Sequence, residues 1–130
     1  MIINNIPISV NVSKNKKVPL NLNTYRNLHF QANNKAKHEL LAAIKMRSFF
    51  DGQMPQPPFE FIYKIYRKDK RRSDLMNIGS VLDKYVSDAL VTLGYISDDN
   101  TDIIKKVTII DGGVDKNNPH ARLEIKSCQI

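Results

Sequence analysis

The chain has 130 residues, 42% of them hydrophobic, which is enough for one domain with a core of modest size. Its net charge of +7 favours polyanionic partners, because phosphate neutralisation supplies most of the non-specific affinity for DNA. The single cysteine, Cys128, excludes a disulfide framework and a cysteine-based zinc site. No apolar run approaches the roughly 20 residues that span a membrane, and the N-terminus lacks a signal-peptide pattern. We therefore expect a cytoplasmic protein without membrane contacts.

The N-terminal third predicts a strand, a loop and a helix. Apolar residues near period 2 predict a strand over residues 2–12, and the asparagine-rich stretch 13–31 predicts an ordered loop. A helix is expected over 32–48, where apolar residues recur on one side of the helical wheel. Gly52 and the prolines after it end this segment.

The middle of the chain carries the clearest periodicities. Residues 59–67 alternate between apolar and polar side chains, which predicts a strand. Residues 78–93 follow the i, i+3, i+4, i+7 pattern of an amphipathic helix, and Gly94 is placed to terminate it.

Two further strands are expected over 103–110 and 121–127, joined as a long hairpin by a segment rich in glycine and asparagine. The order is thus strand, helix, strand, helix, strand, strand. This order indicates a single α+β domain over residues 1–130, with one mixed sheet of about four strands and two main helices on one face.

Acidic residues at element ends are the candidates for chemistry in this basic chain. Phosphodiester cleavage uses a divalent metal, and magnesium prefers carboxylate oxygens. Asp74 follows the basic cluster 67–72, whereas Asp98 and Asp99 follow the second predicted helix. Asp74 can also serve only as a helix N-cap, and the paired aspartates only as a polar turn. Since that helix spans about 24 Å, Asp74 and Asp99 can meet only through a returning chain or through two subunits.

The second helix also has a polar stripe. Asn77, Ser80, Lys84 and Asp88 fall on one side of the helical wheel. Lys84 is a candidate to contact a scissile phosphate or to orient the attacking water. The simpler interpretation is an i,i+4 ion pair with Asp88, which stabilises a helix by about 0.3–0.5 kcal/mol.

Several catalytic and cofactor motifs are missing from the sequence. His29, His38 and His120 share no metal-ligand spacing. No segment resembles a P-loop, a dinucleotide-binding glycine turn or a nucleophilic triad, so we expect no nucleotide cofactor.

The remaining features together resemble the RusA family of Holliday junction resolvases. The matching text is Arg71-Arg72-Ser73-Asp74-Leu75-Met76-Asn77, then Asp88-Ala89-Leu90, Gly94-Tyr95 and Asp98-Asp99. In addition, Arg122-Leu123-Glu124-Ile125 resembles the family's last strand, and 22–27 resembles an asparagine-containing segment of phage-borne members. The likeness covers most of the chain and is strongest over 71–99.

The resemblance implies a homodimer that makes paired symmetric nicks in four-way or branched DNA, using Mg²⁺ or, in its place, Mn²⁺. It implies that Asp74 and Asp99 are catalytic carboxylates and that Lys84 is the catalytic lysine, when aligned backwards from Asp88. Asp74, Asp99 and Asp98 are the expected metal ligands. Basic side chains are expected to contact the DNA backbone: Arg26, Lys35, Lys37, Arg67, Lys68, Lys70, Arg71 and Arg72.

The chain departs from the family pattern in two places. Family members often have Asp-Leu-Asp-Asn where this chain has Asp74-Leu75-Met76-Asn77, so one carboxylate is replaced by methionine. The stretch from Asn77 to Asp88 is also about one helical turn longer, a shift of ~5.4 Å. Candidates to replace the missing carboxylate are Asp83, Asp88 and Asp98. Asp83 lies on the helix face away from Lys84, which favours Asp98 or Asp88.

Two alternatives remain. One is a branched-DNA-binding protein with weak or no catalysis, in which Met76 marks a lost site. Against it, a pure binder has no reason to place Asp74 beside Arg71 and Arg72, where the acid weakens phosphate attraction. The other is a small RNA-binding or RNA-cleaving protein, which lacks here the aromatic stacking pattern of common single-strand RNA modules.

Overall fold

The structure is a computed structural model that describes residues 1–70 and 74–128. Its elements in chain order are β1 (Ile2–Pro7), β2 (Ser9–Ser13), β3 (Lys16–Pro19), α1 (Leu22–Asn27), α2 (Phe30–Arg47), β4 (Phe49–Asp51), β5 (Phe59–Arg67), α3 (Leu75–Thr92), β6 (Ile104–Val114) and β7 (His120–Ser127). The α+β class expected from the sequence is confirmed. Within the described chain, no helix is both long enough and apolar enough to cross a membrane.

The described strands form a main sheet of five strands in the order β4-β1-β7-β5-β6 and a separate two-stranded hairpin of β2 and β3. In the main sheet β5 pairs in parallel with β6, and the other pairs are antiparallel. The predicted hairpin between the last two strands was wrong, because β7 inserts between β1 and β5 while β6 lies on the far side of β5. A strand that follows a crossover helix can pair in parallel, so β5, α3 and β6 form one such unit.

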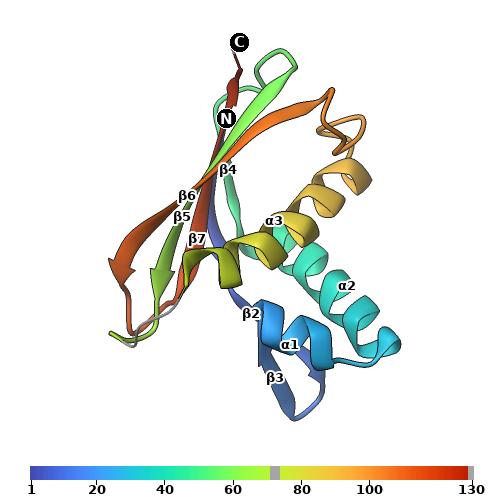
Figure 1. Ribbon diagram of the computed structural model, residues 1–130, viewed down its shortest axis with the longest axis vertical. Coiled ribbons are helices and arrows are strands. Elements are labelled where there is room, and N and C mark those ends of the chain that lie inside the picture. Colours follow the sequence, from blue (N-terminus) through green and yellow to red (C-terminus); the bar gives the residue numbers. More distant parts are fainter. Residues whose placement is uncertain (71–73, 129–130) are drawn as a thin grey trace.

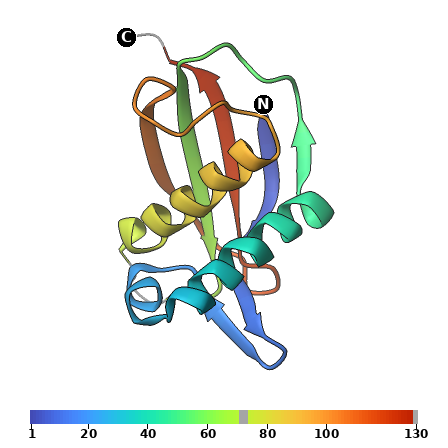
Figure 2. The same cartoon turned by 90° about the vertical axis from the view of Figure 1, so that its right-hand side faces the viewer.

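Helices α2 and α3 cover the same face of the main sheet (Figure 1, Figure 2). The alternation in β5 turns Phe61, Tyr63 and Ile65 to that face, and all three are fully buried. They share a core with the buried side of α3, which includes Leu82, Val86 and Leu90. The expectation of helices on one face is therefore confirmed.

Helix α3 begins at Leu75, three residues before the predicted start at residue 78. Its N-cap is Asp74, whose carboxylate accepts a hydrogen bond from the Met76 backbone N–H. The added residues are Leu75, Met76 and Asn77, and Met76 is exposed, so the buried apolar pattern does not continue regularly through this turn. Gly94 lies just past the helix with φ +84°, the left-handed conformation that suits a terminating glycine.

The N-terminal region contains more structure than the sequence predicted. The single strand expected over 2–12 is two strands, β1 in the main sheet and β2 in the hairpin with β3. The loop expected over 13–31 holds β3 and the short helix α1. Tertiary contacts support these pieces: the Leu20 N–H donates to the Ile8 carbonyl, and the Asn77 side chain of α3 accepts from the Leu22 N–H. Isolated segments of four to six residues lack such support and give little periodicity.

Candidate functional site

Asp74 occupies the N-terminus of α3 as a capping residue. Its Oδ1 accepts from the Met76 N–H at 3.0 Å, and the side chain is exposed. Replacing such a cap by alanine typically costs about 1 kcal/mol. The capping interpretation of Asp74 is thus confirmed, and it leaves the carboxylate accessible for a second role.

Asp98 and Asp99 lie in the exposed turn between α3 and β6. The Asp98 carboxylate accepts from the Asp99 N–H at 2.7 Å and from the Asn100 side-chain amide at 3.0 Å. Asp98 therefore organises its own turn. In doing so it fixes the backbone of Asp99, whose side chain accepts no hydrogen bond from the described residues.

The expected set of Asp74, Asp98 and Asp99 is divided between the two ends of α3. The 18 residues of the helix span about 27 Å, and the turn that holds Asp98 and Asp99 follows the opposite end from Asp74 (Figure 1). Across residues 1–70 and 74–128, no group of three or more His, Cys, Asp or Glu side chains is placed to hold a metal. The structure does not bring Asp74 and Asp99 together within one chain.

Asp83 is the acid that α3 turns toward the sheet. Its Oδ1 accepts from the hydroxyl of Tyr63 at 2.7 Å and from the hydroxyl of Ser87 at 3.1 Å. Tyr63 is fully buried in β5, and Ser87 is buried one helical turn further along α3. Both hydrogen bonds end on one oxygen, and Oδ2 accepts none from the described part of the chain.

The surroundings of Asp83 raise the pKa of its carboxyl above the usual value. Burial is the largest cause, partly offset by the hydrogen bonds from Tyr63 and Ser87, and the charge of Asp99 raises the pKa further. Asp83 and Asp99 therefore lie within electrostatic range of each other. A perturbed acid of this kind is a frequent mark of a functional site.

An opening of about 390 Å³ between α3 and β6 leads to Asp83. Its wall includes Met76, Gly79 and Ser80 from α3, together with Val107 and Ile109 from β6. Helix α3 and strand β6 lie so close together here that a Cβ on Gly79 would collide with the side chain of Ile109. The opening thus gives small ligands a route from the solvent to a partly buried carboxylate.

Asp83 is a residue that the sequence interpretation had set aside in favour of Asp88 and Asp98. Asp88 instead forms an ion pair with Lys37 of α2 at 2.7 Å, and the Asp98 carboxylate accepts hydrogen bonds within its own turn. One signal was available: by spacing, Asp83 lies about 20° beyond Leu90 on the helical wheel, at the margin of the buried stripe. An acid in that position needs polar partners, which here come from Tyr63 and Ser87.

The polar stripe of α3 docks against α1 and α2. The Asn77 Oδ1 accepts from the N–H of Leu22 at 3.1 Å, and Lys84 places its Nζ 5.7 Å from the centre of the Tyr25 ring. The i,i+4 ion pair between Lys84 and Asp88 does not form among the described residues, because Asp88 pairs with Lys37. Lys84 projects toward α1, about 100° around the helix from Asp83.

The expected DNA-binding residues fall into three groups. Three are engaged in ion pairs: Arg67 with Asp111 at 3.3 Å, Lys35 with Glu39 at 3.1 Å and Lys37 with Asp88 at 2.7 Å. Three are exposed: Arg26, Lys68 and Lys70. Arg71 and Arg72 lie outside the described residues. Exposed ion pairs contribute at most about 1 kcal/mol, so Lys35 could exchange its partner for a phosphate at little cost.

Comparisons with known proteins leave the site without an assigned role. No protein-family model matches the chain, and no curated protein matches it.

Proposed function

We propose that the protein is a magnesium-dependent endodeoxyribonuclease that acts as a homodimer and resolves four-way DNA junctions by paired symmetric nicks, in the manner of the RusA family. The observation that carries the proposal is the partly buried carboxylate of Asp83, which is held by the hydroxyls of Tyr63 and Ser87 beside an opening to solvent, in a chain of net charge +7. The charge of Asp99 contributes to raising the pKa of the Asp83 carboxyl, and a bound cation would offset this repulsion.

The donor set fits a magnesium ion. Mg²⁺ is commonly held by one or two carboxylates, with waters and phosphate oxygens completing its coordination. Asp83 and Asp99 would provide these carboxylates, and a bound ion would supply charge neutralisation at the phosphate and an activated water. Tyr63 and Ser87 hold Oδ1 of Asp83 in place, which is the role of residues that orient a metal ligand. Asp83 thereby replaces the carboxylate that the family pattern has at Met76.

The edge of the main sheet supports a dimer. Strand β6 is 11 residues long and pairs with β5 on only one side in the described chain. Large apolar side chains are exposed along it, including Ile110 and Val114, and Met76 of α3 lies nearby with 56% of its surface exposed. A long apolar edge strand is a ready site for pairing with another strand. A second copy that pairs its β6 antiparallel across a two-fold axis would cover this edge.

Such a dimer would also unite the two separated acids. A two-fold axis through the middle of β6 reverses the direction of the second α3. The N-terminus of one α3, with Asp74, would then lie on the side where the turn with Asp99 lies in the partner subunit. Each active site would combine Asp74 of one subunit with Asp83 and Asp99 of the other. Two sites related by two-fold symmetry suit paired cuts in a symmetric junction.

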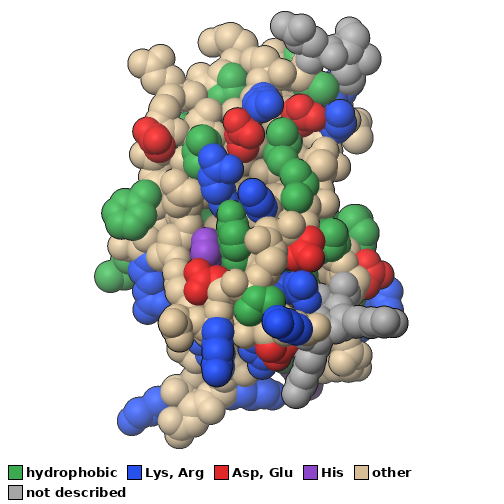
Figure 3. Space-filling view, turned by 90° about the vertical axis from the view of Figure 1, so that its left-hand side faces the viewer, with side chains coloured by type: hydrophobic (Ala, Val, Ile, Leu, Met, Phe, Trp, Pro, Cys, Tyr) green, Lys and Arg blue, Asp and Glu red, His purple; other side chains and the backbone are tan. Residues whose placement is uncertain are grey.

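The open face of the sheet offers a surface for the DNA backbone. Figure 3 shows lysine and arginine side chains across this face, interspersed with acids. Lys64 of β5 is opposite Arg122 of β7, and neither has a carboxylate partner among the described residues. Like charges directly opposite each other destabilise a sheet, so a bound phosphate would relieve this pair. Next to them, the rings of Tyr66 and His120 stack at 4.6 Å.

The test is cleavage of a synthetic four-way DNA junction in magnesium by the wild type and by Asp99→Asn. We expect symmetric nicks from the wild type and a loss of at least about 100-fold in the variant, with junction binding retained. Asp102→Asn is the matched control, because it removes the same charge from the same exposed turn and should cleave normally. Tight binding without cleavage by the wild type in magnesium or manganese would contradict the proposal and favour a binding protein whose site lapsed at Met76.

A further inference from the structure

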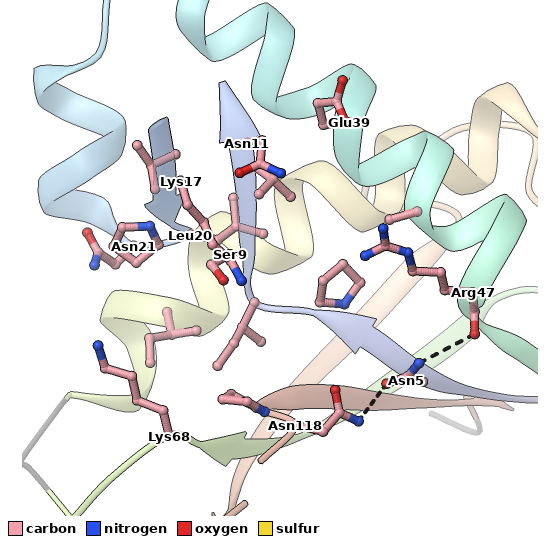
Figure 4. Close-up of a pocket in the computed structure, with 18 of the residues that line it drawn as sticks. Asn5, Ser9, Asn11, Lys17, Leu20, Asn21, Glu39, Arg47, Lys68 and Asn118 are labelled. Carbon is pink, nitrogen blue, oxygen red and sulfur yellow. Dashed lines mark hydrogen bonds between the residues drawn. The ribbon is translucent and has the colours of Figure 1, made fainter. Parts of the chain in front are cut away.

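A large groove lies away from the acidic site, between the β2–β3 hairpin, α2 and the turn that joins β6 to β7. Its volume is about 820 Å³, within the range of about 300–1,000 Å³ that is usual for ligand pockets. Figure 4 shows side chains from the hairpin, α2, β1 and the β6–β7 turn around it. The residues discussed above for cleavage, Asp74, Asp83, Asp99 and Lys84, do not line it.

The groove has an apolar lining. This part comes from aliphatic and proline side chains of several elements, among them Ile8, Val10, Val18, Leu20, Ala43 and Pro119. Val10, Val18 and Leu20 are buried, so the lining is part of the packed structure. A concave apolar surface of this kind can bury the flat face of an unstacked ring, which a base stacked inside a duplex does not expose.

Amide side chains surround this apolar part. Asn5 has φ +60° at a register shift in β1, and its side chain bonds both the Arg47 carbonyl at 3.4 Å and the Asn118 amide at 3.0 Å. Asn21 uses its carbonyl oxygen to cap α1, which leaves its amide N–H groups available. Asn11 is exposed and makes no side-chain hydrogen bond among the described residues. Amides of this kind can donate to and accept from the edge of a nucleobase.

Three cations from three different segments stand at the same groove. They are Lys17 of β3, Arg47 at the end of α2 and Lys68 after β5. None of them has a carboxylate partner within the described chain. The lining also contains two acids, of which Glu39 is paired with Lys35 and Asp69 has an interaction of its own. The groove therefore combines an apolar lining with unpaired positive charge distributed along it.

We propose that this groove holds an unpaired nucleotide of a DNA strand, with the base against the apolar lining and the flanking phosphates on Lys17, Arg47 and Lys68. That DNA is the natural ligand rests on the function proposed above. Figure 4 shows Arg47 well apart from Lys17 and Lys68 around the groove, which favours a strand with successive phosphates over a single free phosphate. At a four-way junction, an unpaired base at the crossover would be such a ligand.

The experiment measures binding of a fluorescent oligothymidylate in EDTA, so that it is independent of metal and of cleavage. The variant is Lys17→Gln/Arg47→Gln, and the control is Lys14→Gln/Lys45→Gln, which removes the same charge from the same hairpin and helix outside the groove. We expect the groove variant to bind about 10-fold more weakly and the control to bind within about 2-fold of wild type. The slope of log K against log salt should fall by about 1.4, since each contact to single-stranded phosphate contributes about 0.7.

Two further probes test the base and the strand separately. An oligonucleotide of abasic sites should bind more weakly than oligothymidylate to the wild type, and Asn11→Ala should reduce that difference. Equal binding of the abasic strand, equal losses in the groove and control variants, or tighter binding of thymidine monophosphate than of the strand would each overturn the proposal. Because this experiment measures binding and not cleavage, a failure of the nuclease proposal would not change its result. Equally, a failure of the groove proposal would not change the result of the cleavage assay.

Discussion

The two sides of α3 use polar residues in different ways. On the side toward α1 and α2, the Asn77 side chain accepts a hydrogen bond from the Leu22 N–H. On the same side, Lys84 lies over the Tyr25 ring and Asp88 forms an ion pair with Lys37. On the side toward β5 and β6, Asp83 is held by two hydroxyls beside an opening to solvent, with Asp99 close enough to raise the pKa of its carboxyl. On the first side, each of these polar groups has a partner within the same chain. On the second side, the carboxylate of Asp83 has hydroxyl partners but no cationic partner among the described residues.

This difference distinguishes polar residues that stabilise the fold from polar residues that remain available to bind a ligand. A polar residue whose partners come from neighbouring helices contributes to docking and has little left to offer a ligand. A partly buried carboxylate next to a second carboxylate lowers the stability of the chain unless a cation is present.

The largest expected difference is in cleavage. Asp83→Asn should reduce junction cleavage in magnesium by at least about 100-fold, because it removes a proposed metal ligand. Asp88→Asn removes the same charge from the other side of α3, where Lys37 is its partner, and should change cleavage by less than about 3-fold. Single-turnover rates with thermal melts as a folding control provide the measurement. Equal losses of cleavage in the two variants would show that the two sides of α3 do not differ in their contribution to activity.

A smaller difference is expected in the free energy of unfolding of two tyrosine variants. Tyr63→Phe removes the hydroxyl that donates to Asp83 at 2.7 Å and should lower the free energy of unfolding by about 2 kcal/mol, because the acceptor is charged. Tyr85→Phe removes a hydroxyl that donates to the neutral Asn33 side chain at 3.2 Å and should cost about 0.5–1 kcal/mol. Urea denaturation at pH 7 measures both. A larger loss of stability for Tyr85→Phe would show that the hydrogen bond from Tyr63 to Asp83 is not the stronger of the two.

The pH dependence of stability should report the burial of Asp83. Its pKa is raised in the folded state, so below the unfolded pKa both states hold the proton and the charge penalty is absent. As the pH rises from the unfolded to the folded pKa, the folded state binds more protons and stability falls. Asp83→Asn should therefore be more stable than wild type at pH 7, with the gap closing toward pH 4. A gap that is constant across this range would exclude a raised pKa.

The sequence predicted the features that depend on regular periodicity. The alternation of β5 and the apolar stripe of α3 gave both elements to within a few residues, and the helices were placed correctly on one face. The pairing of β6 was not predictable, because a glycine-rich connection is compatible with a hairpin and with a strand that crosses to another neighbour. Choosing between them requires knowing that α3 returns the chain to the start of β5.

The candidate site was predicted only in part. The capping geometry of Asp74 and the turn at Asp98 and Asp99 follow from local sequence, and the structure confirms both. The role of Asp83 depends on Tyr63, which is 20 residues away, so no local pattern reveals it. The separation of Asp74 and Asp99 was predicted from helix length, and the structure confirms that they lie at opposite ends of α3.

The smallest expected effect concerns Lys84. Lys84→Met should lower the free energy of unfolding by about 0.5 kcal/mol, because it removes an exposed contact between a cation and the Tyr25 ring. Cleavage should be retained, since the side chain projects toward α1. A loss of cleavage above 10-fold with unchanged stability would support the catalytic role that the family resemblance implies.

Mixing of inactive subunits tests the central claim, that each active site combines Asp74 of one subunit with Asp99 of the other. Asp74→Asn and Asp99→Asn are each expected to be inactive alone. When they are mixed and allowed to exchange, half of the dimers contain one of each, and one of their two sites is intact. The mixture should then recover about a quarter of wild-type nicking. If mixing restores no activity while subunit exchange is demonstrated, the acids do not act across the dimer and the account is contradicted.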